Sequence, residues 1–315
     1  VALGLSVVLG ACSDPAAELP PPLPQDPLVK VYFNHNQAAE YTNPYRSQTR
    51  RGDNLEQIII DTIAQADRSL DLAVQELRLP KIAEALVRRH EAGVKVRVIL
   101  ENQYSRGWSD YSSDEIAELD TRKRNRYDAF RQLADRDGDA EVSEAEASQA
   151  DAVAIVRDAG IPIIDDTADG SKGSGLMHHK FAIADGRHLI VSSANFTNSG
   201  IHGDIDKPAS RGNANHLFAI DAPELAGIFE AEFDLMWGDG PGGEPDSQFG
   251  LQKPFRPVRD VVLGETLVSV KFSPTSRTLD WDKSTNGAIA RALERIDTSA
   301  NLALFVFSEQ QLVDV

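Results

Sequence analysis

Cysteine, basic residues and long hydrophobic runs are all scarce in this sequence. Its 315 residues include a single cysteine, Cys12, so the fold must rest on its hydrophobic core without an internal disulfide. Lys and Arg number 32 against 49 Asp and Glu, and the resulting net charge of −17 repels phosphodiester polymers and anionic membranes at long range. This argues against a non-specific nucleic-acid binder, although a local basic pocket can override it. With 41% hydrophobic and 26% charged residues, the composition is still that of an ordinary globular protein.

The N-terminal residues 1–11 (VALGLSVVLGA) form an apolar run that is too short to span a bilayer. An apolar run ending in small residues is typical of a secretory signal, and Leu9-Gly10-Ala11-Cys12 resembles the lipobox of bacterial lipoproteins, in which the cysteine is lipidated. No initiator Met or basic segment precedes the run, so we expect the natural chain to begin earlier. A buried strand that ends in a core cysteine is the alternative.

Residues 12–27 are then expected to be the lipidated Cys12 followed by a Pro-rich tether. Proline-rich segments form semi-rigid polyproline spacers, which suit a domain held off a membrane surface. The sequence therefore predicts an exported bacterial lipoprotein that is membrane-anchored on the periplasmic or cell-surface side.

Hydrophobic spacing predicts an α/β fold. Strands are expected over 28–33, 69–77, 94–100, 161–164 and 216–220, and helices over 54–66, 80–93, 152–160 and 223–237. Alternating strands and helices imply a mixed, mainly parallel sheet flanked by helices. The polar, helical stretch over about 104–150 indicates an insertion.

The opening pattern returns near the end of the sequence. Residues 299–304 match residues 69–74, an offset of 230 (299 − 69), and the same offset superposes 284–296 on the helix over 54–66. A strand precedes each of these helices, over 29–33 and 267–272. An ordered match of three elements favours an internal repeat. We therefore expect a first domain over 28–264 and the beginning of a second, homologous half over 265–315, truncated in this chain.

Residues 177–195 hold the side chains that suit chemistry on a phosphodiester. His178 and Lys180 point to one face of a strand. A two-residue turn at 185–186 would place Ser193 opposite His178, with Asn195 one step further on the same face. Lys180 offers a charge to a phosphate oxygen, and the serine and asparagine offer neutral donors. A histidine that is neutral near pH 7 can attack phosphorus and form a phosphohistidine.

H-x-K-x-x-x-x-D followed by a G-S-x-N-like segment resembles the signature of the phospholipase D superfamily, over roughly 28–237. His178, Lys180 and Asp185 fill the first motif, and Ser192-Ser193-Ala194-Asn195 fills the second, with Ser192 where the family usually has Gly. The resemblance implies that His178 is the nucleophile and that Lys180 and Asn195 bind phosphate. It also implies that Asp185 orients the site and that the chemistry needs no metal.

Residues 213–216 align with the N-x-E-x segment of the family, whose Glu commonly hydrogen-bonds the nucleophilic histidine. Asn213 and Asn215 are therefore expected at the substrate. Asn215 can hold the imidazole ring but cannot stabilise its charged form as a carboxylate does, so Glu76 and Asp206 are candidates for that role.

The family uses two such motifs, because a second histidine protonates the leaving oxygen. This sequence contains one H-x-K motif. The second is expected either from a C-terminal half beyond residue 315 or from a homodimer. Residues 1–315 as a monomer are expected to lack turnover.

Residues 135–146 resemble an EF-hand calcium loop. The predicted ligands are Asp135, Asp137, Asp139, Glu141, Ser143 and Glu146. Ala140 stands where Gly is expected, and a left-handed Ala costs about 1–2 kcal/mol. We expect Ca²⁺ to brace the insertion, and the alternative is an acidic linker between two helices. The basic cluster 121–126 (TRKRNR) is either a solvated helix face or a contact for a phosphate head group.

The expected activity is hydrolysis of a phosphodiester, or its transfer to an alcohol, with phospholipid favoured by the anchor and the acidic surface. The alternative is an endonuclease acting on DNA or RNA, which should show a basic groove leading to His178, whereas a phospholipase should show an apolar entrance. A third hypothesis is a non-catalytic, calcium-stabilised surface protein with a decayed site, suggested by Asn215.

Overall fold

The computed structural model describes residues 19–171, 175–304 and 306–315, so the predicted signal and the lipidation site Cys12 lie outside the described residues. Residues 19–27 of the predicted tether carry neither helix nor strand. In the described part of the chain, no helix has the length and apolar character needed to cross a membrane.

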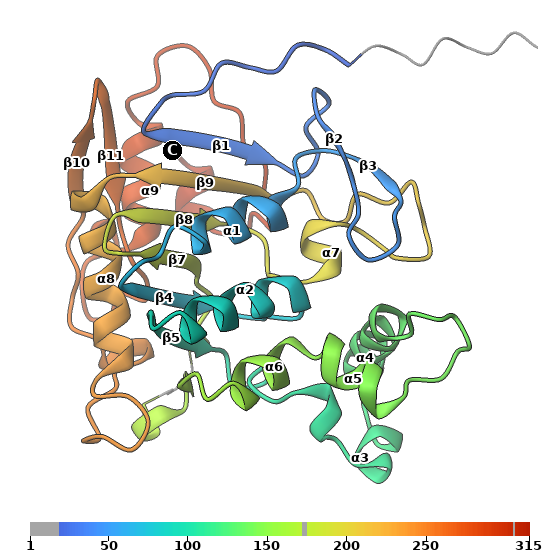
Figure 1. The fold of residues 1–315 in the computed structure, drawn as a ribbon. Helices are drawn as coiled ribbons and strands as arrows, with labels where there is room; N and C mark the ends of the chain where they lie inside the picture. The colour runs from blue at the N-terminus through green and yellow to red at the C-terminus, as the bar shows by residue number, and fades with distance from the viewer. Residues whose placement is uncertain (1–18, 172–174, 305) are drawn as a thin grey trace, which may run out of the picture.

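A seven-stranded sheet in the order β1-β9-β8-β7-β4-β5-β6 forms the centre of the molecule (Figure 1). Its strands are β1 (Val29–Phe33), β4 (Ser69–Val74), β5 (Lys95–Leu100), β6 (Ile163–Asp165), β7 (Lys180–Ala184), β8 (His188–Ser192) and β9 (His216–Asp221). β1, β8, β4, β5 and β6 run in one direction, and β7 and β9 run in the other. The predicted α/β fold with a mixed, mainly parallel sheet is confirmed, although only β4–β5 and β5–β6 are parallel neighbours.

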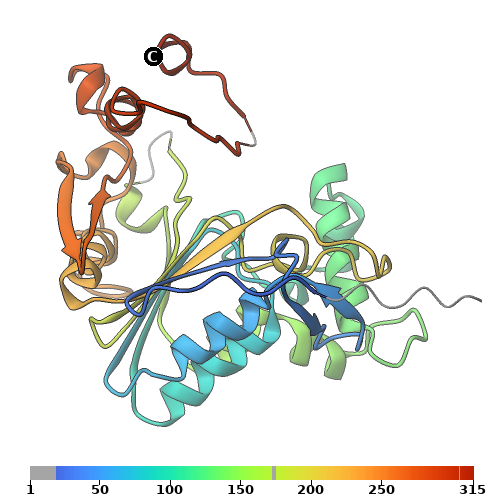
Figure 2. The same cartoon turned by 90° about the horizontal axis from the view of Figure 1, so that it is seen from above.

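Helices cover both faces of this sheet. α1 (Leu55–Ile63), α2 (Pro80–Glu91) and α6 (Ala152–Asp158) cover one face, where α1 and α2 lie side by side, and α8 (Pro223–Trp237) covers the other (Figure 2). Alternation along β4 explains the two cores: Leu70 and Leu72 pack toward α1 and α2, whereas Ala73 packs toward α8. Pro80 and Pro223 start their helices, where a missing N–H costs nothing.

The hairpin between β7 and β8 differs from the predicted register by one residue. Asp185 and Gly186 have the expected positive φ angles of 56° and 64°, but Ala184 lies opposite His188 and not opposite Arg187. Arg187 has no partner on β7 because it interacts instead with the end of β9. Its carbonyl accepts the N–H of Ala222, and its guanidinium pairs with Asp221. The predicted pairing of His178 with Ser193 is therefore wrong.

A second, two-stranded sheet of β2 (Glu40–Thr42) and β3 (Thr49–Arg51) holds the loop after α7 (Asn198–Ile201). The buried guanidinium of Arg50 donates to the carbonyls of Asp204, Lys207 and Pro208. A buried charge that satisfies several carbonyls fixes their positions, so this loop has a defined place beside the sheet edge.

Residues 104–150, expected to be an insertion, contain α3 (Ser113–Ala117), α4 (Thr121–Ala134) and α5 (Glu144–Ala150). They share a small core of their own around Trp108, Phe130, Ala134 and Ala150. Short 3-10 turns occur at Trp108–Asp110, Ala168–Gly170, Gly250–Gln252 and Trp281–Lys283.

The C-terminal residues form the hairpin β10 (Arg259–Leu263) and β11 (Thr266–Val270), then α9 (Thr285–Leu293) and α10 (Gln310–Val313). α9 lies at the predicted offset of 230 from α1 (285 − 55 and 293 − 63). The strand expected over 299–304 is not formed, and Leu302 and Leu304 are each 56% exposed with no strand beside them in the described residues. The second half therefore remains a prediction.

Candidate active site

A cavity of about 320 Å³ lies at the edge of the sheet where β4 and β8 end and β7 begins. These three points meet because β7 runs antiparallel to both of its neighbours. The predicted site residues that line the cavity are His178, Lys180, Ser193, Asn195, Asn213 and Asn215. The structure therefore brings together every predicted catalytic or substrate-binding residue except Asp185.

Lys180, the first residue of β7, supplies a buried positive charge. Its side chain is 7% exposed, and Nζ donates to Gln75 Oε1 at 3.3 Å and to the His178 carbonyl at 2.9 Å. Burial lowers the pKa of Lys180 to about 8, against the opposing effect of the Glu76 charge. Two of the three ammonium N–H groups are thus engaged, and the third remains for a ligand oxygen.

Gln75, directly after β4, is the functional residue that sequence reasoning missed. Its Oε1 accepts from Lys180 Nζ and from Asn195 Nδ2 at 3.1 Å. An ammonium can only donate, so the amide oxygen must face it, and Asn195 must then also donate. The two predicted phosphate ligands are therefore aligned by one acceptor, more than 100 residues earlier in the chain.

His178 precedes β7 and lines the cavity. Burial, followed by the positive charges of Lys180 and His179, lowers the pKa of His178 below its ordinary value of 6.5. A neutral imidazole keeps a nitrogen lone pair available for attack. Among the described residues, no side chain donates to or accepts from this ring.

Asn215 does not hold the ring of His178, contrary to the expectation from the N-x-E-x segment. Its Nδ2 donates to the Gly200 carbonyl at 2.8 Å, and its Oδ1 accepts from Ser193 Oγ at 2.9 Å. Both amide groups are thus used to fix the cavity wall. The carbonyl of Asn213 likewise accepts from Asn34 Nδ2 at 2.7 Å.

A bend after β8 explains why Ser193 and Asn195 still face the cavity despite the shifted register. Ser192 Oγ donates to the His216 carbonyl at 2.8 Å and accepts the N–H of Ala194 at 3.0 Å. The hydroxyl therefore stabilises the turned backbone at the position where the family usually has Gly, a role that glycine lacks the side chain to perform.

Asp185 lies at the opposite end of β7 and does not line the cavity. Its carboxylate accepts the N–H groups of Asp67, Arg68 and Ser69 at 2.8–2.9 Å. Burial alone would raise the pKa of Asp185, but these three donors outweigh it and lower the pKa. Its grouping with the catalytic residues is corrected: it clamps the hairpin turn to the start of β4.

The remaining histidines of interest have structural partners. His179 lies on the opposite sheet face, where its Nε2 is 3.4 Å from Glu232 Oε1 and its ring packs on Phe272. His202 is buried with Nε2 2.8 Å from Glu56 Oε2 and Nδ1 2.8 Å from the Tyr41 hydroxyl.

Of the two candidate carboxylates, Glu76 lines the cavity and is 4% exposed. Its Oε1 lies 3.4 Å from Arg78 Nε and 3.7 Å from Arg126 Nε. Asp206 accepts from Gln132 Nε2 at 2.6 Å and does not line the cavity. Arg126 belongs to the basic cluster 121–126, so one member of that cluster reaches the cavity.

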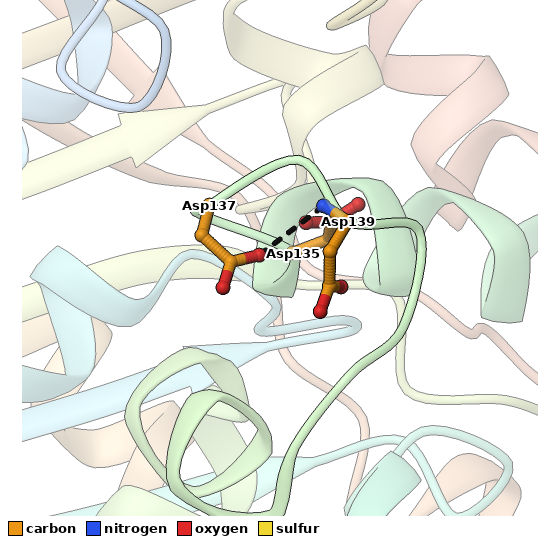
Figure 3. A group of neighbouring side chains, drawn as sticks. All are labelled: Asp135, Asp137 and Asp139. Atoms are coloured by element: carbon orange, nitrogen blue, oxygen red, sulfur yellow. Dashed lines mark hydrogen bonds between the residues drawn. The ribbon is translucent and has the colours of Figure 1, made fainter.

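The EF-hand-like loop connects α4 to α5, and Figure 3 shows its three aspartates. Asp135, Asp137 and Asp139 each offer a carboxylate oxygen, and these oxygens all lie within 4.8 Å of one another. Ala140 has a φ of 66°, the left-handed conformation that the sixth position of such a loop requires. This donor set of hard oxygens fits Ca²⁺.

The carboxylate of Glu146 does not belong to this group of aspartate oxygens. Glu146 accepts the N–H of Arg136 at 2.9 Å and the N–H and hydroxyl of Ser143 at 3.0 and 2.8 Å, forming the capping box of α5. These donors, with the Arg136 N–H first, lower the pKa of Glu146 to about 2. The predicted ligand atom of Glu141 is its backbone carbonyl, and the N–H of the same residue donates to Asp139 Oδ1 at 2.8 Å.

The chain is similar to a known protein family over the residues that form this site. Residues 59–237, more than half of the chain, match the family model described as cardiolipin synthase, PLD-like domain. Mitochondrial cardiolipin hydrolases of Xenopus tropicalis and Chlamydomonas reinhardtii are 24% and 26% identical over 175 and 178 residues, which are 56% of this chain and 57% and 55% of theirs. The chain thus spans about half the length of these relatives.

Among solved structures, the phospholipase D family member Nuc from Salmonella typhimurium is 16% identical with a TM-score of 0.38, covering 68% of this chain and 95% of that chain. The family match spans β4, β7 and β8, and with them the whole H-x-K-x-x-x-x-D segment and the cavity edge. This chain belongs to the PLD-like family of the phospholipase D superfamily.

Proposed function

We propose that this chain hydrolyses a phosphodiester of a phospholipid, or transfers it to an alcohol, through a phosphohistidine on His178. The observation that carries the proposal is the convergence of a neutral imidazole, a buried ammonium and two neutral donors in one cavity. Lys180 and Asn195 would hold the phosphate oxygens, and Ser193 would join them by exchanging its hydrogen bond to Asn215 for one to the substrate, while a ring nitrogen of His178 lies at the phosphorus.

The chemistry proceeds in two displacements. A ring nitrogen of His178 forms a bond to phosphorus, and the bond from phosphorus to the leaving oxygen breaks. That oxygen takes a proton from a general acid, for which the proposal names the histidine of a second H-x-K motif. Water or an alcohol then attacks phosphorus and gives its proton to that second histidine, which now acts as a base; the P–N bond breaks, and the His178 imidazole returns to its neutral form.

The cavity wall favours a lipid substrate over a nucleic acid. Four apolar side chains contribute to its lining: Trp108, Phe130, Leu133 and Ile205. This apolar wall suits acyl or glycerol carbons, whereas a nucleic acid needs a continuous basic track. The relatives named cardiolipin hydrolases support the same choice.

The test is to trap labelled phosphate on the protein. The full-length protein is incubated with a phospholipid labelled at its phosphodiester, quenched in alkali and analysed for phosphohistidine. His178→Asn should remove the label and lower turnover by about 10⁴-fold or more, whereas His188→Asn, at the far end of the hairpin, should keep both. A label that survives His178→Asn, or turnover of DNA with no turnover of lipid, would overturn the proposal.

For the insertion we propose a Ca²⁺ ion held by Asp135, Asp137 and Asp139. The ion would supply charge that ties α4 to α5 through the loop, and α4 forms part of the cavity wall. Calcium should therefore raise the melting temperature of the protein, and Asp135→Ala should abolish that shift. An unchanged melting temperature in saturating calcium would refute the site.

For the N-terminus we propose lipidation of Cys12 and anchoring of the domain through the Pro-rich tether. The supporting observation is the lipobox-like sequence before Cys12. Expression of the full-length protein with labelled fatty acid should label the wild type and leave Cys12→Ser unlabelled. Equal labelling of the two proteins would contradict the assignment.

A further inference from the structure

Arg78 and Arg126 meet at the cavity from two distant parts of the chain. Arg78 follows β4 by four residues, and Arg126 comes from α4 of the insertion. Each guanidinium lies over an aromatic ring: Arg78 is 5.1 Å from the Trp108 centroid, and Arg126 is 4.7 Å from that of Tyr104. Stacking on a ring fixes a guanidinium plane while leaving its N–H edges available for ligands.

The two arginines share one carboxylate oxygen. Both approach Glu76 Oε1 through Nε, at 3.4 Å for Arg78 and 3.7 Å for Arg126. Nη1 of Arg78 also donates to the Arg106 carbonyl at 3.2 Å, whereas no partner of the Arg126 Nη groups occurs in the part of the chain that the structure describes. One carboxylate therefore faces two guanidinium groups, and the Nη groups of Arg126 remain available to donate to a ligand.

The charge balance of the cavity is the reverse of that of the chain. Three cations (Arg78, Arg126, Lys180) and two carboxylates (Glu76, Asp204) line it, so it carries +1 (3 − 2) in a chain of −17. Asp204 also has an external partner, Lys207 Nζ, at 3.4 Å. In a cavity that is partly lined by apolar side chains, such an excess focuses the local field on anions.

We propose that Arg78 and Arg126 form a second anion subsite next to the catalytic phosphate site, so that the preferred substrate carries a further anionic group beyond the scissile phosphodiester. Glu76 directly follows Gln75, which bonds Lys180, and this places the arginine pair beside the phosphate ligands. A phosphate fits better than a carboxylate, because it can accept from two guanidinium forks at once. The inference deepens the proposed function and rests on it for the identity of the neighbouring site.

The test compares two soluble anions that differ by one phosphate. Binding of glycerol 1,3-bisphosphate and of glycerol 3-phosphate to the full-length protein is measured by calorimetry, which needs no turnover. The wild type should bind the bisphosphate about tenfold or more tightly, as expected for charge-assisted hydrogen bonds. Arg126→Gln and Arg78→Gln should each remove most of that preference. Arg126→Lys should retain part of it, because lysine keeps the positive charge but lacks the paired N–H groups of a guanidinium.

Arg122→Gln is the matched control, because Arg122 is exposed on the same helix and its loss changes the net charge equally. It should leave the preference intact, and circular dichroism establishes that every variant is folded. Equal affinity of the wild type for both anions, or an unchanged preference in Arg126→Gln, would refute the subsite. Failure of lipid turnover with the preference intact would refute the proposed function alone.

Discussion

At the scale of single residues, Lys180 and His178 should set opposite limits on the pH range of the proposed activity. His178 must be neutral to attack, and burial together with Lys180 and His179 lowers its pKa below 6.5, so activity should rise with pH through a value below 6.5. Lys180 must be charged to hold phosphate, and burial brings its pKa to about 8, so activity should fall as pH rises through about 8.

The variant Lys180→Arg isolates the alkaline limit. A guanidinium stays protonated across this pH range, so the loss of activity near pH 8 should disappear. The value of kcat should still drop, because the planar guanidinium cannot make the same hydrogen bonds as the ammonium group. The measurement is kcat/KM across pH 5–10. An alkaline limb that stays in place in Lys180→Arg would assign it to another group.

Asp185 should contribute to stability and not to chemistry. Asp185→Ala leaves three backbone N–H groups without their acceptor and should cost about 1–3 kcal/mol in the free energy of unfolding. Asp185→Asn keeps an oxygen for two of them and tolerates the φ of 56°, so it should cost less. Denaturant unfolding gives both values, and a loss of kcat in Asp185→Asn without loss of stability would contradict this role.

At the scale of helices and strands, spacing predicted most of the sheet because each element has a strong local pattern. α8 has the predicted bounds of 223–237, and the strand before Gln75 and the helix after Leu79 were both expected. The hairpin register could not be predicted, because Asp221 and Ala222 of a later strand decide where Arg187 goes. Gln75 was missed for the same reason: its partners become neighbours only after the sheet forms.

The strained turn of the insertion offers a test at this scale. Ala140→Gly removes the strain of a left-handed Ala, which costs about 1–2 kcal/mol in the free energy of folding. Part of this gain is offset because Gly gives the unfolded chain more conformational entropy. The melting temperature should rise and calcium affinity should increase up to about fivefold, measured by calorimetry. The control is Ala145→Gly in α5, where helical geometry makes the same substitution destabilising. Equal effects of the two substitutions would contradict the role of the turn.

At the scale of the whole molecule, the net charge of −17 opposes approach to anionic surfaces, whereas the residues that line the cavity carry a net charge of +1. Raising ionic strength from about 0.01 M to 0.15 M shortens the Debye length from about 30 Å to 8 Å and screens the long-range repulsion first. Turnover of anionic vesicles should therefore increase over this range and turnover of zwitterionic vesicles should stay constant. A steep fall with salt is the signature of a nucleic-acid enzyme and would favour that alternative.

The single H-x-K motif gives a further prediction for the molecule as a whole. Residues 1–315 expressed alone should be inactive as a monomer, because one histidine cannot both attack and protonate the leaving oxygen. Specific activity is measured against protein concentration together with sedimentation. Full activity in a monomeric sample would show that a residue of this chain supplies the proton.

The adjacent residues His178 and His179 lie on opposite sides of the sheet. His178 lines the cavity, and His179 contacts Glu232, Phe181 and Phe272 on the other side. A single peptide bond thus joins His178 to a residue that packs against the core between the sheet, α8, β10 and β11. A substitution at Phe272, whose ring packs against His179, is therefore expected to shift the neighbouring His178 through the backbone, although Phe272 does not line the cavity.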